Sequence, residues 1–190
     1  MKSQNFTIGI DDLRRGLASI LYEIEQMLSA RSEMAILAQE HPRRRLSLGT
    51  EIALLESFLV HIRNLDDLYS KPKRGNLQPT ILCDDYGFDK ADVLDKDDRK
   101  LINTYMSHLS YDRVCLRDTP HWDLTRFGRV YESSLKFLSH IGKDSQLVDG
   151  EEQRIKKIRR DLRHILSPGK TDKHSDPPTE AFTTSSDSPH

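Results

Sequence analysis

The sequence predicts an all-α protein: an irregular bundle of about five helices followed by a disordered C-terminal tail. Along most of the chain, apolar residues recur at spacings of three and four, the period of an amphipathic helix. No segment shows the alternation of apolar and polar residues that is typical of a half-buried strand. Charged residues make up 31% of the chain and aromatic residues 7%, which suits charged helices better than a β-sandwich.

The first two helices are expected to be long. The first should run from Ile10 to Gln39, with acidic residues in its first turn and Pro42 beyond its end. The second should run from Leu48 to Tyr69, capped by Ser47 or, as a second choice, Thr50. Its apolar positions cover a broad arc of the helical wheel, so we expect it to be the most buried helix.

Three shorter helices complete the predicted bundle. Residues 71–96 contain two prolines and two glycines, so we expect a long loop there, with a short turn at Thr80 to Tyr86. The third helix is expected from Asp97 to Tyr111 and the fourth from Trp122 to Ile141, with Gly142 at its end. The fifth is expected from Glu151 to Leu166.

The chain is expected to form one domain, residues 1–166, which is long enough to bury one sizeable hydrophobic core. Residues 167–190 contain four prolines, five serines and four threonines, with Phe182 as their one aromatic residue. Such a segment cannot bury enough apolar area to offset its ordering entropy, so we expect disorder.

The composition also narrows the class of protein. No stretch approaches the ~18 consecutive apolar residues of a membrane span, and the N-terminus has no secretory pattern. Cys83 and Cys115 show neither metal-type nor disulfide-framework spacing. We therefore expect a cytoplasmic protein that contacts no membrane. The net charge is −1, so a nucleic-acid site would have to rest on a local basic patch.

The third helix carries the first candidate site, Asn103-x4-His108. His108 is a candidate general acid or base because imidazole titrates near neutral pH. A step of five residues is ~500° around a helix, so the two side chains lie ~140° apart. They can line one cleft only when a second helix or a second subunit supplies the other wall. The alternative is that His108 simply hydrogen-bonds to a neighbouring helix.

Polar residues on the second helix form a second candidate site. We expect the second and third helices to lie side by side, and polar groups on a mostly buried helix need partners. Glu56, His61, Arg63 and Asn64 would then share a polar pocket with His108, Tyr111 or Arg113. Alternatively, the charged residues form a solvated face with ordinary ion pairs. No His-x3-His or Glu-x2-His spacing supports a metal, and no phosphate loop or dinucleotide motif supports a cofactor.

The fifth helix has a basic face with six cations in ten residues and one acid, Asp161. The cations are Arg154, Lys156, Lys157, Arg159, Arg160 and Arg163. Together with basic loops at residues 43–45 and 71–74, they form a candidate phosphate-binding surface. The alternative is a solvated amphipathic helix. Aromatic residues are not interleaved with these cations, so stacking on single strands is not indicated.

The chain resembles the HEPN superfamily of small all-α bacterial proteins. The segment Leu101 to His108 falls on that family's Arg-x4-6-His motif, with His108 at the histidine position and Asn103 at the arginine position. The segment Leu54 to Leu65 also looks like a helix of uncharacterised bacterial proteins of this kind. The resemblance implies a bundle of four or five helices, a homodimer in which two motifs face one cleft, and an RNA or protein partner. It also implies a role in bacterial defence or a toxin–antitoxin system.

Asn103 departs from the motif, because Asn lacks the permanent charge and forked donors by which Arg would stabilise a phosphate in its transition state. Our leading hypothesis is therefore a binding or regulatory protein that has lost catalysis. The first alternative is a metal-independent endoribonuclease, with His108 as acid or base and Arg63 or Arg113 as phosphate clamp. The second is a helical adaptor without an active site that binds a protein partner through its fifth helix.

Overall fold

The computed structural model describes residues 8–40, 48–70, 81–107 and 123–167. Within these ranges the chain forms five α-helices and two short 3-10 helices, and it contains no strand. The predicted all-α fold is confirmed. Parts of the prediction lie outside the described residues: Ser47, the end of the third helix at residues 108–111, Trp122, and the predicted tail beyond residue 167.

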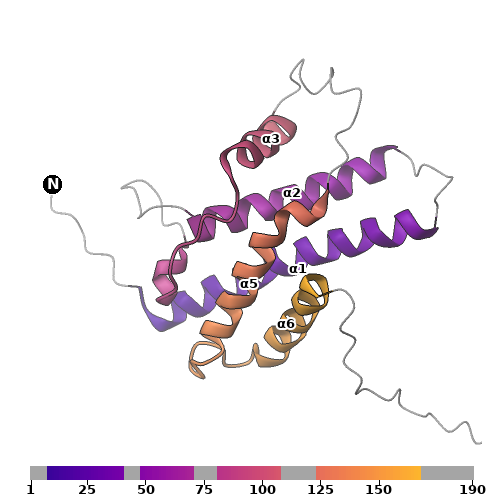
Figure 1. The fold of residues 1–190 in the computed structure, drawn as a ribbon. Coiled ribbons are helices and arrows are strands. Elements are labelled where there is room, and N and C mark those ends of the chain that lie inside the picture. Colours follow the sequence, from indigo (N-terminus) through magenta and orange to yellow (C-terminus); the bar gives the residue numbers. More distant parts are fainter. Residues whose placement is uncertain (1–7, 41–47, 71–80, 108–122, 168–190) are drawn as a thin grey trace, which may run out of the picture.

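Two long helices, α1 (Ile10–Glu40) and α2 (Leu48–Ser70), run side by side in opposite directions (Figure 1). At a rise of 1.5 Å per residue, the 31 residues of α1 span about 46 Å. The two helices pack through facing rows of fully buried apolar side chains. These rows are Leu17, Leu21, Ile24 and Met27 on α1, and Phe58, Leu59 and Ile62 on α2. Both predicted helices agree with the structure to within one residue, and Thr50 lies inside α2 rather than capping it.

Two further helices pack across this pair. α5 (Gly128–Ile141) crosses α1 and α2, and α6 (Glu152–Leu166) packs against α5 and α1 (Figure 1). The fourth α-helix begins later than the sequence predicts. Residues Leu124–Phe127 form a 3-10 helix, η2, before α5 begins. The Asp123 carboxylate accepts a hydrogen bond from the backbone N–H of Thr125 at 2.9 Å, which stabilises this tighter turn.

Among the described α-helices, α5 has the largest fraction of buried residues. The expectation that the second helix is the most buried is therefore wrong by this measure. Seven of the 14 residues of α5 are buried, because it lies between α2 and α6. Phe137 of α5 meets the rings of Tyr69, Tyr86 and Phe88 edge-on, with centroid distances of 6.0, 5.4 and 5.5 Å. Such edge-to-face pairs contribute about 0.5–1.5 kcal/mol each beyond area burial. This aromatic group ties the loop after α2 to the core.

The predicted turn in that loop is a 3-10 helix, η1 (Cys83–Tyr86), which lies against α1. The Tyr86 hydroxyl donates a hydrogen bond to the carbonyl oxygen of Leu13 at 2.9 Å. This approach is open only because residue 16 is glycine: a Cβ there would lie 2.5 Å from the Tyr86 hydroxyl oxygen. Gly16 is therefore a steric requirement within α1.

The third helix, α3 (Lys96–Ser107), is joined to α2 by an ion pair with two hydrogen bonds. Arg99 Nε donates to Asp66 Oδ2 at 2.7 Å, and Arg99 Nη2 donates to Asp66 Oδ1 at 2.9 Å. A second ion pair, Asp98–Arg126, joins α3 to η2. Burial raises the pKa of Asp98, and Arg126 opposes that shift. The predicted adjacency of the second and third helices is confirmed.

Replacing Asp66 by Asn should lower the free energy of unfolding by about 1–3 kcal/mol, because Arg99 loses a charge-assisted, two-point partner. Urea unfolding followed by circular dichroism measures this change. The matched control is Asp12→Asn, which removes an exposed ion pair with Arg15 in the first turn of α1 and should cost less stability than Asp66→Asn does. Equal destabilisation by the two variants would show that the Asp66–Arg99 pair does not hold α3.

Candidate functional site

A polar cluster lies where α1 meets α2, built around one carboxylate. Nδ1 of His61 lies 2.6 Å from Oε2 of Glu23, and the Asn64 amide donates to the same oxygen at 2.9 Å. The ring of Tyr22 meets the His61 ring edge-on, with centroids 6.0 Å apart. The His61 side chain is 11% exposed and that of Glu23 is 26% exposed. We call these four residues the Glu23 cluster.

This arrangement fixes the orientation of the imidazole. Because a carboxylate can only accept, Nδ1 is the donor in this contact, and no hydrogen bond from another described residue to the second ring nitrogen, Nε2, accompanies it. A carboxylate that holds one imidazole nitrogen while the other stays free is the arrangement by which proteins prepare a histidine to accept a proton. The same contacts also join α1 to α2, so the cluster has a structural effect in any case.

His61 and Asn64 were both expected in a polar site, but with partners on the third helix. The described partner, Glu23, lies instead on α1, 38 residues earlier in the chain. His108 and Arg113 lie outside the described residues, so the pocket they were expected to share with His61 stays a prediction.

The remaining candidates on α2 and α3 are less enclosed. Asn103 is exposed on α3 and Arg63 is exposed on α2, whereas Glu56 is half-buried. Among the described residues, no hydrogen bond or ion pair joins Asn103 or Arg63 to His61. The structure therefore brings His61 together with Glu23, Tyr22 and Asn64, and leaves Asn103 and Arg63 facing solvent.

The basic face of α6 divides into inward and outward cations. Arg154 Nη2 donates to Glu25 Oε2 at 2.7 Å and Arg154 Nε to Oε1 at 3.0 Å, and its Nη1 lies 3.3 Å from Glu151 Oε2. The hydrogen bonds to Glu25 and Glu151 raise the pKa of Arg154. Arg159 is half-buried, and its Nε is shielded from solvent without a hydrogen-bond partner. Arg154 therefore stabilises the contact of α6 with α1, and Arg159 is partly buried rather than extending from the surface.

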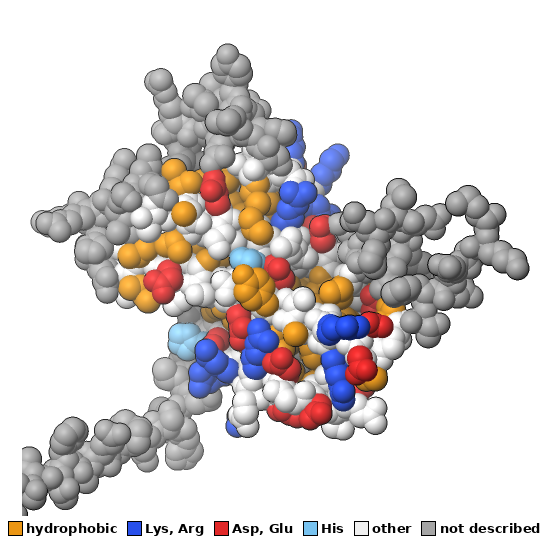
Figure 2. Space-filling model, turned by 180° about the vertical axis from the view of Figure 1, so that it is seen from behind, with side chains coloured by type: hydrophobic (Ala, Val, Ile, Leu, Met, Phe, Trp, Pro, Cys, Tyr) orange, Lys and Arg blue, Asp and Glu red, His pale blue; other side chains and the backbone are white. Residues whose placement is uncertain are grey.

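The outward cations form a row along α6. Lys156, Arg160 and Arg163 are exposed and lie at successive spacings of four and three, and we call them the α6 ridge. No described carboxylate lies within ion-pair distance of Lys156 or Arg163, while Arg160 Nε lies 3.3 Å from the adjacent Asp161. Basic and acidic side chains are intermixed over the face seen in Figure 2, so any basic surface here is local.

Three further findings limit the functional assignment. In the part of the chain that the structure describes, no group of three or more His, Cys, Asp or Glu side chains is placed to hold a metal ion. No helix in these ranges is long and apolar enough to cross a membrane. Comparisons with protein-family models, with curated proteins and with solved structures gave no match.

The Glu23 cluster predicts a measurable coupling between α1 and α2. Glu23→Ala should lower the free energy of unfolding by about 1–3 kcal/mol, because it leaves a mostly buried imidazole nitrogen without its acceptor. In Glu23→Ala/His61→Ala, the loss should fall short of the sum of the two single losses by at least about 0.5 kcal/mol. Asn64→Ala, which removes the exposed hydrogen bond to the same oxygen, is the matched control and should cost less. Strict additivity of the two single losses would contradict the pairing.

Proposed function

We propose that this chain is an RNA-binding helical protein of the HEPN-like kind, which holds RNA through the α6 ridge and does not cut it. The proposal rests on the row of outward cations, Lys156, Arg160 and Arg163. Two other basic residues of the same helix, Arg154 and Arg159, turn inward. Among the described residues, Lys156 and Arg163 have no carboxylate within ion-pair distance, and Arg160 meets only the adjacent Asp161, so the row stays open to an external anion.

The dimensions of the ridge suit a phosphate backbone. From Lys156 to Arg163 the helix rises about 10 Å, at 1.5 Å per residue. That length matches about three phosphates at ~3.4 Å of axial rise per nucleotide in one strand of a duplex. The arginine guanidinium is a planar fork that pairs with phosphate at two points. No aromatic side chain alternates with the cations, which favours contacts to the backbone over stacking on bases.

The absence of cleavage follows from the residue at position 103. Asn103 takes the place where the resemblance expects arginine, and it lies exposed on α3. A neutral amide cannot neutralise the charge that develops on a phosphate during cleavage. RNA bound at the ridge would then stay intact. This outcome suits a binding or regulatory role in a bacterial defence or toxin–antitoxin system.

Reversing two ridge charges should weaken RNA binding. In Lys156→Glu/Arg160→Glu, the affinity for a short fluorescent RNA should fall by on the order of tenfold or more at low salt, because about two phosphate contacts are lost. Fluorescence anisotropy across a salt series measures both quantities. With a duplex probe, the slope of log affinity against log salt should become shallower by about 1.8, since each of the two lost phosphate contacts contributes about 0.9.

The matched control is Lys96→Glu/Lys100→Glu, an exposed pair with the same spacing on α3, on the other side of the α1–α2 pair in Figure 1. It reverses the same number of charges and should leave RNA binding nearly unchanged. If both double variants lose affinity equally, net charge rather than the ridge governs the binding. If wild-type protein binds no RNA at low salt, the proposal is wrong.

Incubation with total RNA in EDTA separates binding from cleavage. The wild-type protein should leave the RNA intact on a denaturing gel, since Asn103 supplies no charge to the transition state. Cleavage by the wild type that disappears in His108→Ala would replace this proposal with the metal-independent endoribonuclease. Equal cleavage by wild type and variant would remove His108 from any active site and point to a contaminating nuclease.

A further inference from the structure

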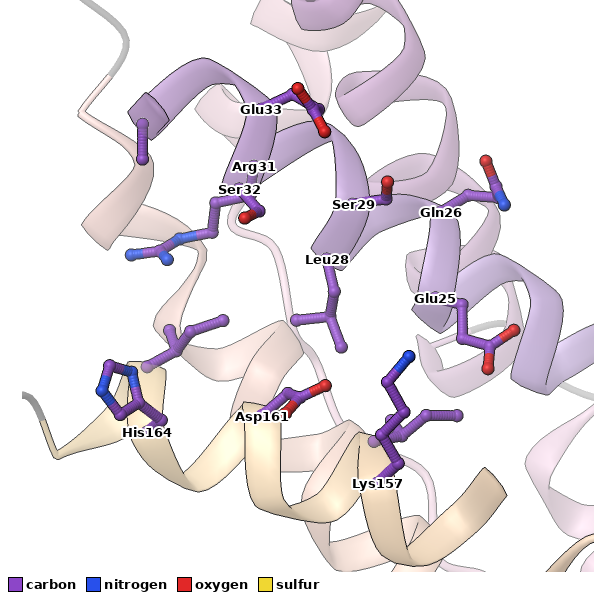
Figure 3. Close-up of a pocket in the computed structure, with 13 residues that line it drawn as sticks. Glu25, Gln26, Leu28, Ser29, Arg31, Ser32, Glu33, Lys157, Asp161 and His164 are labelled. Atoms are coloured by element: carbon purple, nitrogen blue, oxygen red, sulfur yellow. The ribbon is translucent and has the colours of Figure 1, made fainter. Parts of the chain in front are cut away.

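A groove of about 690 Å³ lies between the second half of α1 and the facing side of α6 (Figure 3). Its apolar lining comes from Leu28, Ile158 and Ile165, and polar groups surround them. The volume falls within the range of about 300–1,000 Å³ that is typical of small-molecule sites. The groove is separate from the α6 ridge, which lies on the solvent side of the same helix.

Arg31, a partly buried cation of this groove, has no counter-charge among the described residues. The guanidinium carbon of Arg31 lies 5.7 Å from the centroid of the Tyr131 ring, and Arg31 Nε is buried without a hydrogen-bond partner. Burial raises the pKa of Tyr131 to about 12, so its hydroxyl stays protonated at neutral pH and does not neutralise Arg31. Among the described residues, no carboxylate lies within ion-pair distance of Arg31. A half-buried charge in this condition favours an external anion.

The other ionisable groups of the groove come from both of its walls. His164 of α6 lies on the same side of the groove as the Arg31 guanidinium, and Lys157 extends from α6 toward α1 (Figure 3). Glu33 points away from α6 (Figure 3). Asp161 lies between His164 and Lys157 along α6.

Neither remaining carboxylate takes the place of an anion beside Arg31. Glu25 is held by two hydrogen bonds from Arg154, and Asp161 lies 3.3 Å from Arg160 Nε. Asp161 would repel a second negative charge in the middle of the groove, so a ligand with a single charge fits better than a polyanion.

We propose that the groove binds a small monoanion with an apolar body, namely a medium-chain carboxylate. Its carboxylate group lies at the Arg31–His164 end, and its hydrocarbon chain lies along Leu28, Ile158 and Ile165. Burial of its methylene groups favours binding through the hydrophobic effect, and Arg31 gains the counter-charge that it lacks. This activity is independent of RNA binding at the ridge.

Isothermal titration calorimetry of the full-length chain with sodium octanoate tests the inference. We expect saturable binding with one site per chain. Arg31→Gln should weaken it by on the order of tenfold or more, the effect of removing a charge-assisted hydrogen bond. His164→Gln changes an exposed residue, so it should leave the fold intact and also weaken binding. The matched control is Arg15→Gln, an exposed arginine elsewhere on α1, which should bind as the wild type does.

Neutral n-octanol provides the second control, because it has the same chain without the charge. It should bind at least about tenfold more weakly than octanoate if Arg31 holds the carboxylate. Equal binding of the two probes, absence of saturable octanoate binding, or unchanged affinity in both Arg31→Gln and His164→Gln would each overturn the proposal. Circular dichroism of each variant shows whether a loss of binding reflects a loss of fold.

Discussion

The packing of α1 against α2 is the constraint on which the other elements depend. Because their facing apolar rows are fully buried, each polar residue at the margin of this contact has to find a partner or remain in solvent. Glu23 meets His61 at the contact with α2, and Glu25 meets Arg154 where α6 approaches. Helix α1 thus forms a polar cluster with α2 and a charged groove with α6.

The helices could be predicted from the sequence because their signals are local. Apolar periodicity and helix-breaking residues act over a few positions, so the bounds of α1 and α2 agree with the structure to within one residue. The predicted start of the fourth helix is wrong, and the reason is equally local. The Asp123 side chain satisfies the N–H of Thr125 and favours a 3-10 turn at Leu124–Phe127, which the apolar pattern alone does not distinguish from an α-helix.

The candidate sites could be predicted only in part, since their pairing depends on how helices are aligned in space. His61 was identified from its own helix, but Glu23 becomes its partner only once the antiparallel alignment of α1 and α2 is known. On α6, the composition indicated a basic face without showing which cations turn inward. Arg154 turns inward to meet Glu25 of α1, and that partner is known only once the placement of α6 against α1 is known.

The close approach at Gly16 has a consequence for how the chain tolerates changes at its beginning. Tyr86 holds the Leu13 carbonyl from 73 residues away, and the absence of a side chain at residue 16 leaves room for its hydroxyl. Trimming the protein past the opening turns of α1 would therefore remove the anchor of η1, a segment distant in sequence. A protein shortened in this way would therefore lose a contact that holds the connection between α2 and α3, in addition to its own N-terminal residues.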